Sequence, residues 1–408
     1  MRSFSVAISL FLFYNVALLA QATNPFAPRT VVDFGAKPDD NKSDAAAFQA
    51  AIDAYKRGEI AEILIPSGKF DIDRTLEYKT MGYTRGIMIR GLGETSVLVY
   101  SKNDGSPLFR IDGCSQRSYQ FQRGGYIKDL KITASKSDFT KQGAAIEILG
   151  WWRYEISSIC IRSWGGNGIY FPQRPDIDAN PDAWASQVGN IHNNEIAFCE
   201  GWGIRADIST GFGGTVISSC SIGACKGGGI LASGSANEVV HCSIFSNGKT
   251  GKGNNEGGIK LIRTLGASPM NWHIAYCELD SNKDYNVSIE GAVNIVIEYC
   301  RNNSWEAVFK DGEMSPKVHF RIVPTKGAVN INIDFNGNIH RWERADKGEV
   351  TCYDLGNDGN TGSVTIRNPF YMSADLQKKY ANVRPNTQVK IEERNVQLDT
   401  ELFKATKK

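Results

Sequence analysis

The chain has 408 residues, of which 41% are hydrophobic and 22% charged, an ordinary globular composition with enough apolar residues for a large core. The formal net charge is only +2 and no basic run is dense, so nothing in the charge pattern favours a nucleic-acid partner. After the first residues, no segment is long and apolar enough to cross a membrane as a helix.

The first residues, MRSFSVAISLFLFYNVALLAQA, have the pattern of a secretory signal peptide. Arg2 precedes an apolar run, and residues 20–22 (AQA) form a typical cleavage site. A membrane anchor is the alternative, but the apolar run is short and Asn15 interrupts it. We therefore expect residues 1–22 to be removed and residues 23–408 to be secreted, extracellular or periplasmic, as a monomer that has no membrane partner.

The segment from about residue 30 to residue 75 has the features of an N-terminal cap. Ser43 or Asp44 can cap a helix, and a strand, EILIPSGKFDI, follows that helix. An end cap is physically required in a solenoid, because the terminal coil otherwise exposes its core and an unpaired edge. The helix should bury the apolar residues that recur at intervals of three and four, which are Ala47, Phe48, Ala51, Ile52 and Tyr55.

A repeat begins further along the chain. Five segments start with a small residue followed by an apolar one: GIYF at 168, GIRAD at 203, GILAS at 229, GIKLI at 258 and NVSIE at 286. Each is followed by a loop and a second short strand, and the period of about 23 to 35 residues is too short for a βαβ unit. The pattern predicts a single all-β domain, a parallel β-solenoid. Its coils cover about residues 85–310, and residues 340–408, where the repeat is lost, form a C-terminal cap and tail.

Nine cysteines in an exported protein usually indicate disulfides, but their positions favour another interpretation. Asn194 occupies one equivalent position of the repeat, and in the next four coils that position is taken by Cys220, Cys242, Cys277 and Cys300. Equivalent positions stack about 4.8 Å apart, so we expect an inward ladder of mainly reduced thiols, with disulfides within the ladder as the alternative. Asn247 and Asn282 share a second equivalent position, where stacked amides can bond along the axis.

The sequences VVDFGAKPDDNKSDAAAFQAAIDA and ILIPSGKFDI resemble the opening of the pectate-lyase-like superfamily, most closely its rhamnogalacturonase/epimerase-like members. The resemblance covers about residues 30–310 and implies a right-handed parallel β-helix. The superfamily includes lyases, hydrolases, epimerases and phage tailspikes, so the resemblance does not define one reaction. It also implies that the outer face of the first strand in each coil, with its flanking loops, forms a cleft for an extracellular polysaccharide.

Alternation along the first strands predicts which side chains leave the helix. Those expected to point inward are Ile146, Ile169, Ile204, Ile230, Ile259 and Val287. A first outward column should contain Glu147, Tyr170, Arg205, Leu231, Lys260 and Ser288. A second outward column, two residues on, should contain Leu149, Pro172, Asp207, Ser233, Ile262 and Glu290. Arg205 and Asp207 therefore share one strand face, and Lys260 lies two coils further on, about 10 Å away.

This face can support lyase chemistry. A lyase needs a base that removes a proton alpha to a carboxylate, and cations that stabilise the resulting enolate. The resemblance implies an Arg or Lys base, which makes Arg205 and Lys260 the leading candidates, and Arg263 can hold a uronate carboxylate through two hydrogen bonds. Together with Asp207, these residues form the predicted catalytic group. Cations outnumber paired acids here, so β-elimination on a uronic-acid-containing glycan such as pectin is the leading interpretation.

A glycoside hydrolase is the second interpretation. It needs two carboxylates at one of two separations, which Asp207, Glu147, Glu290 and Glu256 can supply. However, the Gly-His-Gly and Asn-Thr-Asp elements of polygalacturonases are absent, as is the Tyr-Gly-Phe-Asp-Pro-His motif of alginate epimerases. A non-catalytic carbohydrate-binding or adhesin solenoid is the third interpretation.

The longest insertion in the repeat, PQRPDIDANPDAWASQVG, follows Phe171, and we expect it to wall the cleft. Trp184 can stack on a sugar ring there, or can pack within the loop itself. Asp176, Asp178 and Asp182 alternate as calcium ligands do, which indicates Ca²⁺ as a cofactor. A proline replaces the turn glycine, so an ordinary polar loop is the alternative. The predicted substrate-binding side chains are Trp184, Glu147, Tyr170, Glu256 and Glu290.

Overall fold

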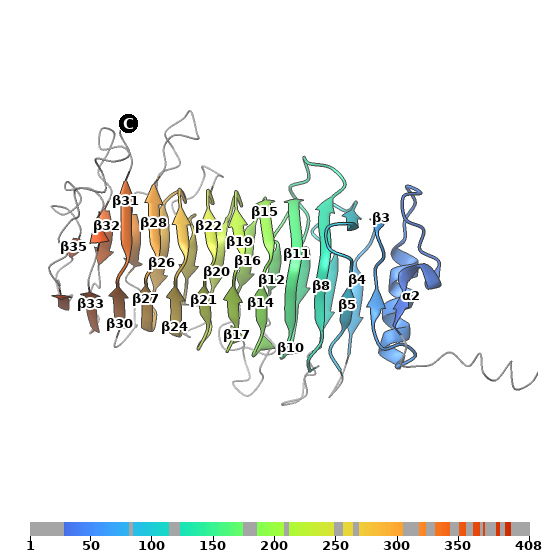
Figure 1. The fold of residues 1–408 in the computed structure, drawn as a ribbon, viewed down its shortest axis with the longest axis horizontal. Coiled ribbons are helices and arrows are strands. Elements are labelled where there is room, and N and C mark those ends of the chain that lie inside the picture. The colour runs from blue at the N-terminus through green and yellow to red at the C-terminus, as the bar shows by residue number, and fades with distance from the viewer. Residues whose placement is uncertain are drawn as a thin grey trace, which may run out of the picture.

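In the computed structural model the chain forms an elongated solenoid, with strands stacked from the N-terminal cap to the C-terminal coils (Figure 1). Within the described part of the chain, no helix has the length and apolar character needed to span a membrane. The structure describes residues 28–80, 85–113, 123–173, 186–207, 212–248, 256–263, 269–304, 318–323, 331–342, 351–355, 362–367, 370–371, 381–383 and 388–392.

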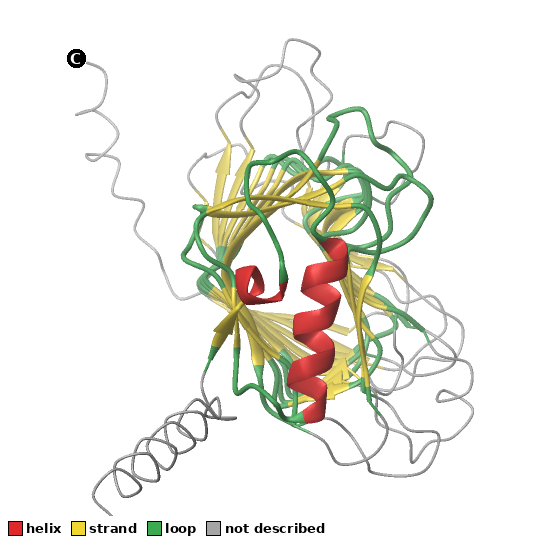
Figure 2. Cartoon of the chain, turned by 90° about the vertical axis from the view of Figure 1, so that its right-hand side faces the viewer, coloured by secondary structure: helices red, strands yellow, loops and turns green. Residues whose placement is uncertain are grey.

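The predicted capping helix is confirmed as α2 (Ala45–Arg57), which lies across the end of the solenoid in Figure 2. All five predicted apolar positions are buried, and the rings of Phe48 and Phe70 meet edge-on with centroids 5.3 Å apart. A short 3₁₀ helix, η1 (Val31–Phe34), packs beside α2. The helix ends at Gly58, whose φ of 79° is a conformation that glycine adopts without strain. Together η1 and α2 cover the apolar interior of the first coil, as a solenoid requires.

The first strands of the coils form one parallel sheet of eleven strands, called the site sheet below. Its members are β4 (Leu76–Lys79), β7 (Phe109–Asp112), β9 (Ile146–Ile148), β12 (Ile169–Phe171), β16 (Trp202–Ala206), β20 (Gly228–Ala232), β23 (Ile259–Leu261), β26 (Tyr285–Glu290), β29 (Val318–Val323), β32 (Thr351–Leu355) and β35 (Ala381–Val383). A separate sheet of three short strands runs beside it and consists of β10 (Trp151–Trp152), β13 (Ser186–Gln187) and β17 (Phe212–Gly213).

A larger parallel sheet of twenty-two strands forms the other walls of the solenoid. Its members are β1 (Arg29–Thr30), β2 (Ile63–Leu64), β3 (Gly68–Ile72), β5 (Met88–Arg90), β6 (Ser96–Tyr100), β8 (Tyr126–Ala134), β11 (Glu155–Trp164), β14 (Asn190–His192), β15 (Glu195–Cys199), β18 (Val216–Ser218), β19 (Ser221–Gly223), β21 (Glu238–Val240), β22 (Ser243–Phe245), β24 (Met270–Ala275), β25 (Glu278–Asp280), β27 (Val293–Glu298), β28 (Arg301–Ser304), β30 (Ile331–Asn336), β31 (Ile339–Trp342), β33 (Gly362–Arg367), β34 (Phe370–Tyr371) and β36 (Gln388–Glu392).

Single residues with positive φ bend the chain between neighbouring strands of this larger sheet. Ser219, His241, Tyr276 and Tyr299 have φ angles of 51°, 55°, 55° and 51°, and each directly precedes a cysteine of the predicted ladder. A left-handed conformation costs a non-glycine residue about 1–2 kcal/mol. Backbone hydrogen bonds to the next coil offset this cost: the amide of His241 donates to Ala275 O at 3.1 Å, and that of Tyr276 to Glu298 O at 3.1 Å.

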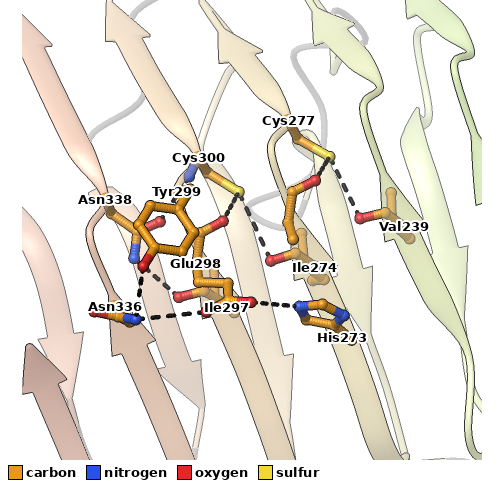
Figure 3. Close-up of polar contacts among 11 residues, drawn as sticks. Val239, His273, Ile274, Cys277, Ile297, Glu298, Tyr299, Cys300, Asn336 and Asn338 are labelled. Atoms are coloured by element: carbon orange, nitrogen blue, oxygen red, sulfur yellow. Dashed lines mark hydrogen bonds and ion pairs between the residues drawn. The ribbon is translucent and has the colours of Figure 1, made fainter.

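The predicted cysteine ladder is confirmed. Cys220, Cys242, Cys277 and Cys300 are buried and unpaired, in register along the interior. Each thiol lies against backbone carbonyls; that of Cys277, for example, donates to Val239 O at 3.5 Å and to Ala275 O at 3.3 Å (Figure 3). An asparagine stands at each end of the ladder: Asn194 Nδ2 lies 3.7 Å from Cys220 Sγ, and Asn338 Oδ1 accepts the amide of Cys300 at 3.0 Å.

The second predicted ladder is also present. The side-chain amide of Asn247 donates to Asn282 Oδ1 at 3.0 Å, and both side chains are fully buried. Each amide also donates to a backbone carbonyl, Asn247 to Ile222 O and Asn282 to Ile244 O, both at 3.0 Å. These bonds satisfy polar groups that would otherwise be costly to bury.

The coils extend further than the sequence predicts in both directions. Parallel pairing begins with β1 and β2, before residue 85, and continues past residue 310 to β33 and β36. Residues 362–392, expected to belong to a C-terminal cap, therefore contribute strands to both large sheets. The sequence signal fades there because the glycine and cysteine positions that mark the central coils are replaced by other residues.

Candidate active site

The outer face of the site sheet has the two columns of side chains that alternation predicts. Cα pairing places Glu147, Tyr170, Arg205, Leu231, Lys260 and Ser288 in one line, in that order. The six residues predicted to point inward from these strands, Ile146, Ile169, Ile204, Ile230, Ile259 and Val287, are fully buried. The rigid backbone ladder therefore holds the polar side chains of this face at fixed axial intervals of about 4.8 Å.

Three predicted residues meet in one hydrogen-bonded group. Arg205 Nε lies 3.0 Å from both carboxylate oxygens of Asp207, and Arg205 Nη2 lies 2.8 Å from Asp207 Oδ2. From the neighbouring strand, the Tyr170 hydroxyl donates to Asp207 Oδ2 at 2.9 Å, and its ring centroid is 5.3 Å from Arg205 Cζ. The Arg205 side chain is 37% exposed and that of Asp207 only 15% exposed. The carboxylate is thus largely enclosed, while the guanidinium keeps a surface for a ligand.

The electrostatics of this group define what each side chain can do. Burial raises the pKa of Tyr170, and the charge of Asp207 and its hydrogen bond raise it further, so the phenol stays protonated. Burial would by itself lower the pKa of Arg205, but the hydrogen bond and charge of Asp207 outweigh it and raise that pKa. Arg205 is therefore a permanent cation in this arrangement, suited to holding negative charge rather than to accepting a proton.

A second charged pair lies two coils further on. Lys260 Nζ is 2.9 Å from Glu290 Oε1, and these side chains are only 11% and 20% exposed. Lys260 belongs to the first outward column and Glu290 to the second, one coil away. Between the two cations of the first column lies Leu231, which is almost completely buried and gives the face an apolar floor between Arg205 and Lys260.

The other predicted acidic residues also have cationic partners. Glu147 accepts a hydrogen bond from Arg110 at 2.7 Å, and Glu256 Oε2 lies 3.9 Å from Lys283 Nζ. Both of these described carboxylates are therefore parts of ion pairs.

Trp202 of β16 and Tyr285 of β26 were not among the predicted site residues. The ring of Trp202 covers Gly228 and the ring of Tyr285 covers Gly257, where an added Cβ would lie 2.2 and 2.6 Å from ring atoms. Ser288 is fully buried although it belongs to the outward column, and within the described ranges its hydroxyl has no hydrogen-bond partner. The available signal was the pairing of an aromatic residue with glycine at the equivalent position of the next or preceding coil.

Comparison with known proteins agrees with this architecture. Residues 28–91 match the family model described as "Rhamnogalacturonase A/epimerase, pectate lyase-like". The protein is a right-handed parallel β-helix. The match confirms the resemblance proposed from the opening motif. A comparison with curated proteins finds no match.

Several solved structures have the same fold as this β-helix. The A-module of a mannuronan C-5 epimerase from Azotobacter vinelandii is 14% identical, with a TM-score of 0.58 over 89% of this chain and 95% of that one. DFA-IIIase from Arthrobacter chlorophenolicus is 12% identical, with a TM-score of 0.63 over 89% and 93%. A Streptomyces thermodiastaticus α-1,3-glucanase is 14% identical, with a TM-score of 0.52 over 89% and 67%. At these identities the likeness shows the fold alone.

The structure describes only some of the remaining predicted site residues. Arg263 lies two residues after the last residue of β23 and is partly exposed. Trp184 and the predicted calcium ligands Asp176, Asp178 and Asp182 lie outside the described residues. Of the loop predicted to wall the cleft, the structure describes the last part, which belongs to a coil. Ser186 and Gln187 form β13, and Gly189 packs against the Tyr154 ring.

One group of potential metal ligands exists in the described ranges of the β-helix, on the larger sheet. Single ligand atoms of Glu94, Cys160 and Glu195 lie within 4.8 Å of one another. Burial and the neighbouring carboxylates raise the pKa of the Cys160 thiol, and the two glutamates already pair with Lys131 and Arg162. A protonated thiol between neutralised carboxylates is a poor ligand set for Ca²⁺, which prefers oxygen donors alone.

Proposed function

We propose that the protein is a secreted, monomeric polysaccharide lyase that cleaves a uronic-acid-containing glycan by β-elimination. Its fold is one that carbohydrate-active enzymes share, and the finer proposal is carried by one observation. Arg205 and Lys260 stand in one column of the site sheet on either side of the apolar Leu231. By strand spacing, their Cα atoms are about 10 Å apart, so both cations stand within the span of a short segment of glycan.

The two cations have different roles in this proposal. The permanently charged Arg205, oriented by Asp207 and Tyr170, pairs with the uronate carboxylate and stabilises the enolate that forms when the adjacent C–H bond is broken. Lys260 is the proton acceptor, because an amine loses its proton more readily than a guanidinium does. Glu290 Oε1, 2.9 Å from Lys260 Nζ, first takes a proton from the ammonium, which leaves Lys260 as a neutral amine.

Lys260 Nζ, whose ammonium proton has passed to Glu290, takes the proton from the carbon next to the carboxylate, and the electron pair of that C–H bond forms a carbon–carbon double bond. The bond from the neighbouring carbon to the glycosidic oxygen breaks, and the leaving oxygen takes a proton from water. The products are an unsaturated uronate at one new end and a new reducing end at the other, where the leaving oxygen is now the hydroxyl of an anomeric carbon, without net uptake of water.

A substrate screen tests this function. The protein is incubated with acidic polysaccharides, among them polygalacturonate and alginate, and with neutral ones, and both ultraviolet absorbance and new reducing ends are measured. We expect absorbance from unsaturated uronate together with reducing ends on an acidic glycan. Reducing ends without that absorbance would instead identify a hydrolase, and binding without cleavage would identify a carbohydrate-binding solenoid.

A further inference from the structure

The first outward column of the site sheet continues beyond the residues assigned above. Strand β29 follows β26, and Cα pairing places Arg321 next to Ser288, which is itself next to Lys260. Arg321 therefore stands two coils beyond Lys260, just as Lys260 stands two coils beyond Arg205. Cations thus occupy every second position of the column from β16 to β29. By strand spacing, the Cα atoms of successive cations are about 10 Å apart.

The positions between these cations carry no charge. Leu231 stands between Arg205 and Lys260, and Ser288 stands between Lys260 and Arg321. Both of the intervening residues are buried, with 7% and 0% of their surface exposed. The column therefore presents three regularly spaced cations above a floor of low, uncharged side chains.

Acidic residues bound this cationic run at both ends. Before Arg205 the column passes through Tyr170 to Glu147, and after Arg321 the next residue in register is Asp354. These carboxylates disfavour a negatively charged polymer, whereas the cations between them attract it. The column thus defines a stretch from β16 to β29, about 19 Å long by strand spacing, that suits a linear polyanion.

The charge of Arg321 is balanced less closely than the charges of the other two cations. Arg205 and Lys260 each pair with a carboxylate of the second outward column. The residue two positions after Arg321 is Val323, whose neighbour in register, Glu290, is bound to Lys260. Among the residues that the structure describes, no carboxylate forms an ion pair with Arg321, which is partly exposed. A bound anion would therefore gain a partner that is not already engaged in an ion pair.

We propose that Arg321 forms a remote subsite for the carboxylate of a second uronate residue, so that an acidic glycan lies along the solenoid axis from Arg205 to Arg321. A guanidinium can hold a carboxylate through two parallel N–H groups. A polyuronate has a carboxylate on every sugar, so a chain lying lengthwise can bring several of them to the recurring cations. The identity of the ligand as a uronate rests on the proposed function. The path of an anionic polymer rests on the spacing of the cations alone.

The test uses the full protein, galacturonate dimers and long galacturonate oligomers, with dextran sulfate as a polyanion that lacks uronate. Arg321→Gln removes the charge but keeps most of the stem. Arg301→Gln is the control, because Arg301 is 62% exposed and lies on β28 of the larger sheet. Binding is measured by calorimetry, KM is measured on polygalacturonate, and thermal unfolding checks that both variants are folded.

We expect Arg321→Gln to weaken the binding of long oligomers about tenfold and to raise KM, while dimer binding stays unchanged because a dimer does not reach the remote subsite. Arg301→Gln should behave like the unmodified protein. Equal binding of long oligomers by the two variants would overturn the proposal. An equal loss for dimers and long oligomers would also overturn it, because Arg321 would then belong to the primary site.

The outcomes separate this subsite from the proposed reaction. Binding of long galacturonate oligomers that depends on Arg321, without any elimination, would support the subsite and reject the lyase. Normal elimination with binding independent of Arg321 would reject the subsite alone. Binding of dextran sulfate that depends on Arg321, without binding of galacturonate, would support the path of the polyanion and reject uronate as its ligand. Failure of the unmodified protein to bind either polymer would overturn both parts of the inference.

Discussion

Arg205 and Asp207, two residues apart in sequence, meet through three close contacts: Arg205 Nε lies 3.0 Å from each Asp207 carboxylate oxygen, and Nη2 lies 2.8 Å from Oδ2. The Tyr170 hydroxyl holds the same carboxylate from the neighbouring strand at 2.9 Å. An arginine side chain is flexible on its own, but here Asp207 holds one edge of the guanidinium, and the partly exposed remainder can contact a ligand. The pair therefore presents an oriented cation on the site sheet.

Replacing Arg205 should reduce catalysis while leaving the fold intact. We expect Arg205→Ala to lower kcat about a hundredfold or more, since it removes the charge that stabilises the enolate. Arg205→Lys should restore little, because an ammonium is a point charge that cannot contact Asp207 and a carboxylate in the same plane. Steady-state kinetics on the cleaved glycan measure both effects, and thermal unfolding should show little change because the side chain leaves an outer face.

Asp207→Asn is the companion variant. It should keep the shape of the group but remove the charge that orients Arg205, so activity should fall while the melting temperature changes little. Full activity in Arg205→Ala would place the reaction elsewhere and reduce the Arg205–Asp207 contact to a surface ion pair, which contributes little to stability.

Substitutions in the Lys260–Glu290 pair should lower the stability of the protein, and those that remove Lys260 should also abolish its activity. Both side chains are mostly enclosed, so Lys260→Met leaves an unpaired carboxylate and Glu290→Leu an unpaired ammonium. We expect each change to lower the free energy of unfolding by about 1–3 kcal/mol, and the double variant to lose less than the sum of the two. Urea unfolding measures the coupling. Strictly additive losses would show that the charges do not interact, and activity should be lost in every variant that lacks Lys260.

The thiols should be reduced and protected. In the native protein we expect almost none of the seven described cysteines to react with a thiol reagent, because all are buried. After unfolding in denaturant without reductant, most of the nine cysteines of the sequence should react. Finding eight of them oxidised in the unfolded protein would show that the ladder contains disulfides.

Acid should destabilise the C-terminal coils. Burial lowers the pKa of His319 to about 3, and burial together with the charge of His319 lowers that of His340 well below its usual value of 6.5. An unfolded chain takes up these protons below about pH 6.5, whereas the folded protein resists doing so. Stability should therefore be full above pH 6.5 and fall as the pH drops toward 3, by about 2–3 kcal/mol per histidine at pH 4.5.

Urea unfolding between pH 7.5 and 4.5 measures this dependence. The matched variant is His319→Gln, which removes one titrating ring but can still bond to Asn286, whose side-chain amide lies 3.0 Å from His319 Nδ1. Its stability should change less with pH than that of the unmodified protein, even if it is lower at neutral pH. Identical slopes would assign the acid sensitivity to other groups.

Much of the fold could be predicted because a β-coil repeats simple rules. Strand alternation has a period of two, so the isoleucines at 204 and 230 had to face inward once the strands were recognised. Stacking of equivalent positions then placed Cys242 above Cys220, and Arg205 beside Tyr170 and Leu231. These relationships depend only on local pattern and on register, which the recurring glycines and cysteines mark in the sequence.

The partners chosen by long side chains were decided by the tertiary structure. Sequence spacing could not show that Lys260 would reach Glu290, or that Tyr170 would donate to Asp207 across strands. The same holds for the stack of His241, Tyr276 and Tyr299 on the outer turn, with ring centroids 5.2 and 5.3 Å apart. Figure 3 shows Tyr299 beside the buried Cys300. A side chain selects among several neighbours by its rotamer and by the packing around it. Those depend on coils that are brought together only when the whole solenoid has formed.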